Sequence, residues 1–103
     1  MTKPLQGAEV ELRFRATEQG GRSAPLLFGP GTYYRPHFVV PGGDYLGVVV
    51  TRGPSEPIMP GVSVGVAVGF PYDVNYEALS EGTTFNVMEG DRLVAEGRVL
   101  RLY

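Results

Sequence analysis

Few residue types in this chain could carry out chemistry. The 103 residues include one histidine, His37, and no cysteine. A zinc-type metal site would need cysteine or further histidine ligands, and nucleophilic catalysis needs a nucleophile, a base and a group that orients the base. No set of residues here indicates a reaction, and no Gly-x-x-x-x-Gly-Lys-Ser/Thr loop is present to cradle phosphates. We therefore predict a protein that is not an enzyme, with no catalytic residues, no metal, no cofactor and no bound nucleotide.

Two arginines are the strongest candidates for binding. Arg22 follows a Gly-Gly pair, and Arg35 lies within Tyr34-Arg35-Pro36-His37-Phe38. A guanidinium can grip a phosphate or a carboxylate through two parallel hydrogen bonds. Alternatively, each arginine forms an ion pair with an acidic residue nearby and so fixes its own loop. The sequence leaves both interpretations open.

Tyrosines form a second group of candidate contact residues, because the chain has six of them and no tryptophan. Tyr33 and Tyr34 beside Arg35 can stack on nucleic-acid bases. Tyrosine is also enriched in protein interfaces, and it often caps the rim of a barrel. The acidic residues of the turns, by contrast, are expected to be solvated.

Period-two alternation of apolar residues is the main structural signal. Val10, Leu12 and Phe14 fall on one face of residues 9–15 and the charged residues on the other, which predicts a half-buried antiparallel strand. A second such strand is expected over residues 62–70, with valines and Phe70 on one face. Its other face carries only small residues, namely Ser63, Gly65, Ala67 and Gly69. This small-residue face indicates either crowding in a strongly curved barrel or a docking surface.

Turn signals divide the rest of the chain into further short strands. We expect strands over residues 22–28, 32–40, 45–51, 83–88 and 92–102, with Gly97 marking a bulge or a barrel corner. Six or seven short strands separated by glycine- and proline-containing turns predict an all-β closed antiparallel barrel or a sandwich. The barrel is favoured because closure removes free strand edges.

Composition narrows the class of protein. The length fits one domain over residues 1–103, of which residues 1–7 are expected to form a flexible tail. The formal net charge of −2 and a pI near 5.3 lack the basic excess of a dedicated nucleic-acid binder. Residues 1–7 lack the apolar segment of a secretory signal, and no stretch suits a membrane span. We therefore expect a cytoplasmic protein that does not bind membranes.

The order of several short motifs resembles the third, C-terminal β-barrel domain of translation elongation factor Tu. The matching segments, in order, are Gly20-Gly21-Arg22 with Pro25-Leu26, Tyr34-Arg35-Pro36-His37-Phe38, Met59-Pro60-Gly61, Glu89-Gly90-Asp91-Arg92 and Gly97-Arg98-Val99. The resemblance covers roughly the whole chain. It implies a six-stranded antiparallel Greek-key barrel that performs no chemistry and, in that family, grips the backbone of aminoacyl-tRNA.

The resemblance also implies contact positions. These are Arg22, His37, Glu89 and Gly90, to which Arg35 and Arg92 are added as neighbouring arginines. The chain departs from the family pattern at Ser23, where the family has histidine, at His37, where it has glutamine, and at Asp91, where it has a second glycine. A carboxylate added beside a phosphate-contact turn is electrostatically unfavourable.

Two functions follow from these observations. The first is a protein-interaction domain that keeps the barrel and binds another protein. The alternative is an RNA-associated module that contacts tRNA or ribosomal RNA. A continuous basic stripe through Arg22, Arg35 and Arg92 would favour RNA, whereas a mixed-charge, tyrosine-rich surface would favour a protein partner.

Overall fold

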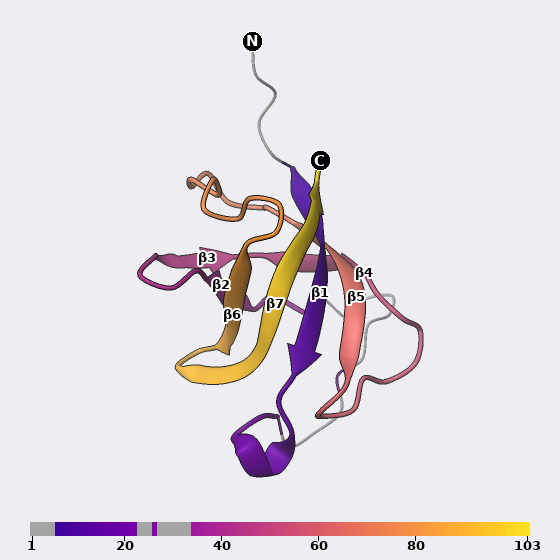
Figure 1. Ribbon diagram of the computed structural model, residues 1–103. Helices are drawn as coiled ribbons and strands as arrows, with labels where there is room; N and C mark the ends of the chain where they lie inside the picture. Colours follow the sequence, from indigo (N-terminus) through magenta and orange to yellow (C-terminus); the bar gives the residue numbers. More distant parts are fainter. Residues whose placement is uncertain (1–5, 23–25, 27–33) are drawn as a thin grey trace.

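The described part of the chain folds into one curled antiparallel sheet with almost no helix (Figure 1). The computed structural model describes residues 6–22, Leu26 and residues 34–103. Within these residues the strands are β1 (Gly7–Phe14), β2 (His37–Val39), β3 (Tyr45–Gly47), β4 (Val49–Arg52), β5 (Ser63–Gly69), β6 (Thr84–Glu89) and β7 (Arg92–Leu102). A short 3₁₀ turn, η1 (Thr17–Gln19), follows β1.

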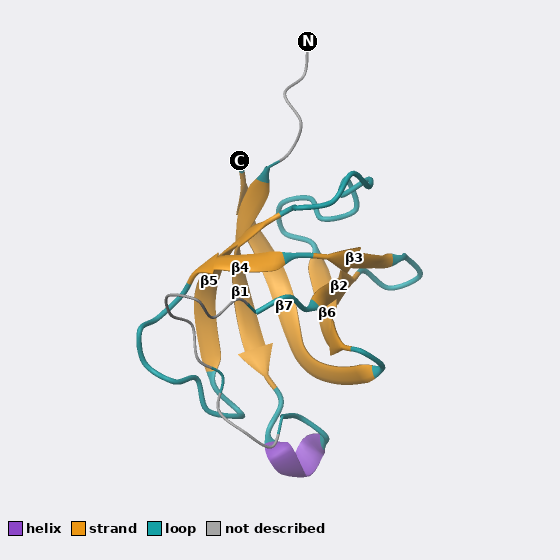
Figure 2. Cartoon of the chain, turned by 180° about the vertical axis from the view of Figure 1, so that it is seen from behind, coloured by secondary structure: helices purple, strands orange, loops and turns teal. Residues whose placement is uncertain are grey.

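The sheet closes on itself because its two outermost strands are consecutive pieces of one chain segment. The strand order is β3-β2-β6-β7-β1-β5-β4, and only Val48 separates β3 from β4. The backbone N–H groups of Val48 and Val50 donate to the carbonyls of Pro36 and Tyr34, so the pairing beside β2 continues past the break. Segment 45–52 is therefore one bent strand that joins β2 to β5 and completes a ring of six (Figure 2).

The connectivity of the ring is a Greek key. β2, the bent segment β3–β4 and β5 are successive antiparallel neighbours, and the chain then returns through residues 70–83 to place β6 beside β2. Three consecutive strands followed by a fourth that returns beside the first define this motif. The predicted all-β antiparallel Greek-key barrel is confirmed.

The barrel interior holds the apolar half of each alternating strand. Val10, Leu12 and Phe14 are buried, as the alternation predicts. The rings of Phe38 on β2 and Phe85 on β6 stack at 4.1 Å between centroids. Burial of such side chains stabilises the fold by about 1.5–3 kcal/mol each. The side chains that alternate with them face outward and form the surfaces considered below.

Gly97 leaves room for a core side chain and does not form a bulge. It lies in regular register opposite Leu12 and Phe85, and a Cβ at this position would lie 2.4 Å from the Phe85 ring. The pairing of β7 does shift register at two other places. One lies between Val87 and Met88 of β6, and the other lies between Glu9 and Val10 of β1. The sequence signal was correct in marking the glycine, but its cause is ring packing.

The small-residue face of β5 is crowded at one end and open at the other. At Gly69 a Cβ would contact the Thr51 and Val49 side chains at 3.4 Å, and Ala67 is buried. At Gly65 nothing lies within 4 Å of that position. The bent strand thus covers this face beside Gly69, at ordinary contact distance, while Gly65 borders a surface pocket of about 300 Å³.

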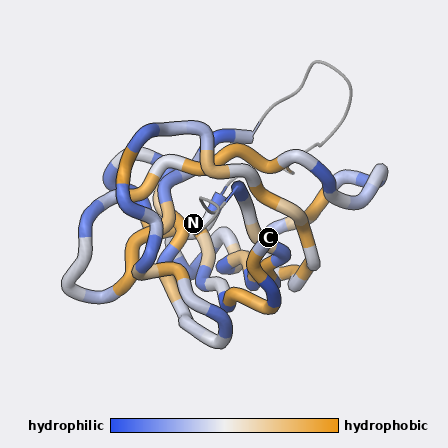
Figure 3. The backbone as a smooth tube through the Cα atoms, turned by 90° about the horizontal axis from the view of Figure 1, so that it is seen from above, coloured by the Kyte–Doolittle hydropathy of each residue, from blue (hydrophilic) through white to orange (hydrophobic). Residues whose placement is uncertain are grey.

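The two described ends of the chain meet at one end of the barrel (Figure 3). The backbone N–H groups of Gln6 and Gly7 both donate to the Tyr103 carbonyl, and Tyr103 donates back to Gly7. Gly7 is thus part of β1 and not of the flexible tail expected over residues 1–7, and residues 1–5 of that prediction lie outside the described residues. The strand expected over residues 22–28 lies largely outside the described residues, although Leu26 bridges Ile58.

Candidate functional site

A polar cluster of Arg22, Glu89 and Tyr34 caps the barrel at the end where η1 lies. The Arg22 guanidinium and the Tyr34 hydroxyl both donate to the Glu89 carboxylate, and Arg22 lies 5.7 Å from the centre of the Tyr34 ring. The Arg22 and Glu89 side chains are only 23% and 29% exposed. The cluster therefore ties the loop after η1 to the end of β6.

Burial is the largest influence on the pKa of the Tyr34 hydroxyl. It raises the pKa of the phenol far above its usual range, and the hydrogen bond to Glu89 and the negative charge of Glu89 act in the same direction. The Arg22 charge acts in the opposite direction and is a smaller cause than burial or Glu89. The neutral Tyr34 hydroxyl donates to Glu89 beside the Arg22–Glu89 ion pair, and this geometry indicates a structural clamp.

Gly90 sets the shape of the hairpin beside this cluster. The β6–β7 turn has Gly90 and Asp91 at its centre, and Gly90 has φ of +63°. Glycine with positive φ at the first central position is typical of a type II′ hairpin turn. Arg92 is directly opposite Glu89 at the start of β7, and its side chain is exposed.

A second group of candidate residues lies on the outer surface of β2 and β3, which we call the His37 face. It comprises His37, Val39, Tyr45, Tyr72 and Met88. His37 is opposite both Gly47 and Met88, and Val39 is opposite Tyr45, so their side chains share one side of the sheet. The Tyr72 ring lies over Gly47, where an added Cβ would be 2.5 Å from it. Tyr45 and Tyr72 are 52% and 54% exposed.

Arg35 borders the His37 face. It precedes His37 by two residues on the same extended segment, and its side chain is exposed. No ion pair within 4.0 Å is found for it among the described residues. Of the predicted contact residues, Arg35 and His37 thus share one surface, while Arg22 and Glu89 are joined in the cluster at the barrel end.

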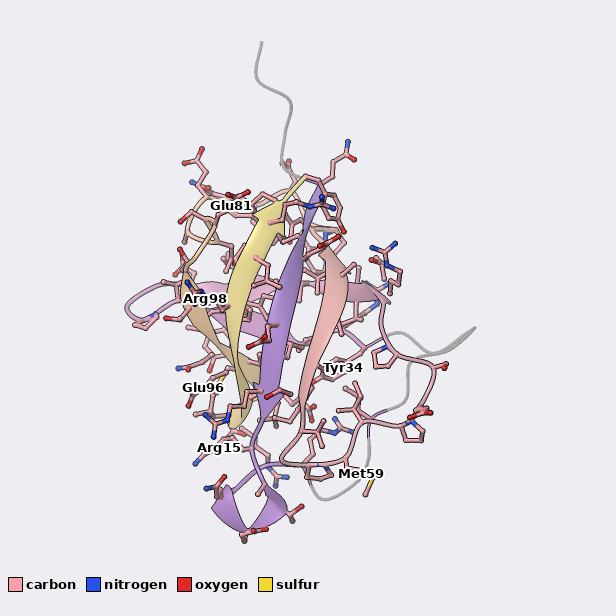
Figure 4. All side chains as sticks on the ribbon, turned by 45° about the vertical axis from the view of Figure 1, so that its right-hand side comes forward. Arg15, Tyr34, Met59, Glu81, Glu96 and Arg98 are labelled. Carbon is pink, nitrogen blue, oxygen red and sulfur yellow. The ribbon has the colours of Figure 1, made fainter. Side chains whose placement is uncertain are left out.

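Opposite charges pair across the outer surface of β1 and β7. Glu11 is opposite Arg98, and Arg13 is opposite Glu96; Figure 4 shows Glu96 and Arg98 projecting outward. Glu9 accepts a hydrogen bond from Arg101 at 2.8 Å. Direct cross-strand pairs of opposite charge stabilise a solvated sheet face. This surface is balanced in charge, unlike the tyrosine-rich His37 face.

A Gly-x-Ser-x-Gly sequence spans Gly61 to Gly65, a spacing that the sequence reasoning missed. In α/β-hydrolases this motif needs a strand, a sharp turn and a helix so that the serine is presented at the turn. Here Gly61 ends a turn with φ of +87°, and Ser63 begins β5 opposite Arg13. The motif is therefore part of a turn-to-strand junction and does not form a nucleophile elbow.

The described residues contain no group of three metal-ligating side chains that could hold an ion. In the same part of the chain, no helix has the length and apolarity to cross a membrane. No protein-family model matches the chain.

The sequence did not predict that Tyr34 is a partner of Glu89 or that the Tyr72 ring covers Gly47. Gly47 within a valine-rich strand was nevertheless a signal for a ring packed closely on the backbone.

Proposed function

We propose that this protein is a non-catalytic protein-binding barrel that docks its partner on the His37 face. The observation that carries the proposal is the exposure of Tyr45 and Tyr72 around His37 on one sheet surface. Tyrosine, methionine and arginine are enriched in protein interfaces, and charged residues are depleted at interface centres. The His37 face follows this pattern, because none of its five residues is an aspartate, glutamate, lysine or arginine and Arg35 lies at its border.

The arrangement of the arginines favours a protein partner over RNA. An RNA-binding stripe would need Arg22, Arg35 and Arg92 to act together on phosphates. Arg22 is instead joined to Glu89, and Asp91 lies next to Arg92. The stripe is therefore interrupted by two carboxylates.

We further propose kinship with the third domain of elongation factor Tu. The six-membered ring and its Greek-key order agree with what the motif resemblance implies, and this agreement supports the relationship. The proposed role then corresponds to the docking functions of that domain. A cytoplasmic location is proposed with it, supported by the absence of cysteine.

Affinity purification of the tagged protein, with and without ribonuclease, tests the protein-binding role. The wild type should retain a defined protein after ribonuclease treatment, and Tyr45→Ser should lose it. Leu100→Ser is the matched control, because Leu100 on β7 is as exposed as Tyr45 but lies outside the His37 face. A partner that disappears with ribonuclease would refute this proposal and identify the RNA-associated alternative.

A further inference from the structure

We propose that the edge of β5 at Ser63 and Gly65 binds an extended peptide segment of a partner protein as an added strand, with an aromatic side chain of that segment packed on Gly65. This site is separate from the His37 face, because β5 is paired with β1 and β4, whereas the His37 face lies on β2 and β3. The inference does not depend on the docking role proposed for that face. Its basis is a stretch of backbone that has no neighbouring strand on one side in the described part of the chain.

Hydrogen bonds show which residues of β5 face each neighbouring strand. The Phe14 N–H group donates to the carbonyl of Val62, the residue directly before β5. Backbone groups of successive residues point to opposite sides of a strand, so the even-numbered residues of β5 face β1 and the odd-numbered residues face β4. The Thr51 hydroxyl donates to the Ala67 carbonyl at 3.2 Å on that second side. The N–H and C=O groups of Ser63 and Gly65 therefore also point to the β4 side.

β4 covers only the second half of β5. Their pairing ends at Arg52, which is opposite Ala67, and the chain then swings away from β5 through residues 53–62 (Figure 1). Among the described residues, neither Ser63 nor Gly65 has a residue of β4 opposite it or a backbone hydrogen bond to a loop residue. Both residues are exposed. They form a free strand edge, which is a template for pairing with another chain.

β5 carries none of the features that usually block such an edge. Its sequence, Ser-Val-Gly-Val-Ala-Val-Gly, contains no charged residue and no proline, and its pairing with β1 proceeds in regular register. Lysine, proline and bulges are common means by which proteins prevent pairing at an exposed edge. An open edge of this kind suits strand addition, in which main-chain hydrogen bonds supply affinity and side chains supply specificity.

Gly65 indicates the kind of side chain that the added strand carries opposite it. At Gly47 and Gly97 an added Cβ would lie 2.5 Å from the Tyr72 ring and 2.4 Å from the Phe85 ring, so an aromatic ring of this chain packs on both glycines. Among the glycines of the described strands, Gly65 alone has nothing within 4 Å of that position. A ring from a neighbouring strand can cover such an edge glycine. An aromatic residue of the partner would complete at Gly65 the packing that the barrel uses elsewhere.

The surroundings of Gly65 suit such a ring. Gly65 borders the surface pocket of about 300 Å³, which Arg52 and Glu9 also line. The Arg52 side chain is 75% exposed, and one of its guanidinium nitrogens lies 3.7 Å from the Glu9 carboxylate. Arg52 is opposite Ala67, two residues along β5 from Gly65, so a ring at Gly65 is close to a guanidinium, which is attracted to aromatic faces. Glu9 would repel an acidic side chain at the same place.

Nuclear magnetic resonance of the isotope-labelled full chain tests the proposal with a defined probe, the capped peptide Thr-Val-Tyr-Val-Thr. The amide signals of Ser63 and Gly65 should shift on titration, and both amides should exchange with solvent more slowly, because each N–H group gains an acceptor. A peptide with alanine in place of the central tyrosine should bind about tenfold more weakly. A peptide N-methylated at that tyrosine should also bind about tenfold more weakly, because it lacks the donor for the Gly65 carbonyl.

Two variants test the same contacts from the protein side. Gly65→Val fills the place of the ring, and Ser63→Pro removes one donor of the free edge without removing a bond to β1, so each should weaken peptide binding by about tenfold. Thr84→Val is the matched control, because Thr84 is exposed on β6, which is not adjacent to β5, and it should bind the peptide as the wild type does. Thermal denaturation identifies any variant that fails to fold, and the N-methylated peptide tests the edge without altering the protein.

Three results would overturn the proposal. Absence of any shift at Ser63 and Gly65 up to the solubility limit of the peptide would show that the edge does not accept a strand. Shifts confined to Gly47 and Met88 would place the peptide on the His37 face, so that the docking role stands and the edge site does not. Shifts of Ser63 and Gly65 on dilution of the protein without peptide would show that a second copy occupies the edge.

Discussion

Arg22 and Glu89, which are 67 residues apart in the sequence, form an ion pair at the η1 end of the barrel. The Tyr34 hydroxyl donates to the same carboxylate. One acidic side chain thus joins three separate segments of the chain. The loop after η1, the segment before β2 and the β6–β7 hairpin are held together there.

Removal of the Glu89 carboxylate should destabilise the fold. Glu89→Ala leaves Arg22 and Tyr34 without this acceptor in a partly buried site, and we expect a loss of about 1–3 kcal/mol in the free energy of unfolding. Urea denaturation followed by circular dichroism measures the loss. Asp91→Asn, in the exposed turn two residues away, should change stability by less than about 0.5 kcal/mol. Equal effects of the two substitutions would contradict the clamp.

The protonation of Tyr34 predicts a loss of stability in alkali. Its pKa is raised in the folded protein, chiefly by burial, so the unfolded chain releases this proton first. The stabilisation is therefore complete below about pH 10, the ordinary tyrosine value, and declines as the pH rises from there toward the folded pKa. Tyr34→Phe should show a shallower decline of unfolding free energy above pH 10. Identical slopes for wild type and variant would show that Tyr34 does not contribute.

Gly97 and Gly65 provide a matched pair of glycine substitutions, since both are in strands and neither has positive φ. Gly97→Ala places a methyl group against the Phe85 ring and should cost about 1–3 kcal/mol by overpacking. Gly65→Ala meets open space and should be neutral or stabilise the strand, because glycine is disfavoured in strand interiors. Thermal denaturation measures the stability of both variants against the wild type. A Gly97→Ala variant as stable as the wild type would argue against the close ring contact.

Tyr76 should anchor the connection between β5 and β6. Its buried hydroxyl donates to the Gly47 carbonyl at 2.6 Å, and its ring stacks on Phe70 at 4.3 Å. Tyr76→Phe keeps the ring but leaves that carbonyl without this donor, at an expected cost of about 1–3 kcal/mol. Amide hydrogen exchange in residues 70–80 should then be faster in the variant than in the wild type, whereas exchange in β1 should change less. Unchanged exchange in the connection would show that the ring alone holds it.

Alternation and turn residues predicted most of the barrel from the sequence. The apolar residues of β1 and Val66 and Val68 of β5 are buried as the alternation predicts, and the Glu89–Arg92 hairpin follows from Gly90. The bend at Val48 was not predicted, because residues 45–51 were interpreted as one continuous β-rich run in spite of Gly47. The bend arises from closure of the ring, a constraint that local residue preferences do not contain.

The candidate sites were predicted only as separate residues. Arg22 and Glu89 were both selected, but their contact depends on how β6 is placed beside β2, and strand order is not encoded in the spacing of either residue. Two alternatives were left open for Arg22, a ligand contact or an ion pair. The structure shows the ion pair, and it places Arg35 on a different surface.

The meeting of Gln6 and Gly7 with Tyr103 has a mechanical consequence. β1 and β7 are antiparallel, so tension applied between these two ends acts at one end of their shared ladder. Backbone hydrogen bonds in such a ladder lie perpendicular to the strands, and they would rupture one after another, as in a zipper, and not all together. The barrel would therefore yield to a small pulling force in this direction, because the load falls on these hydrogen bonds in turn.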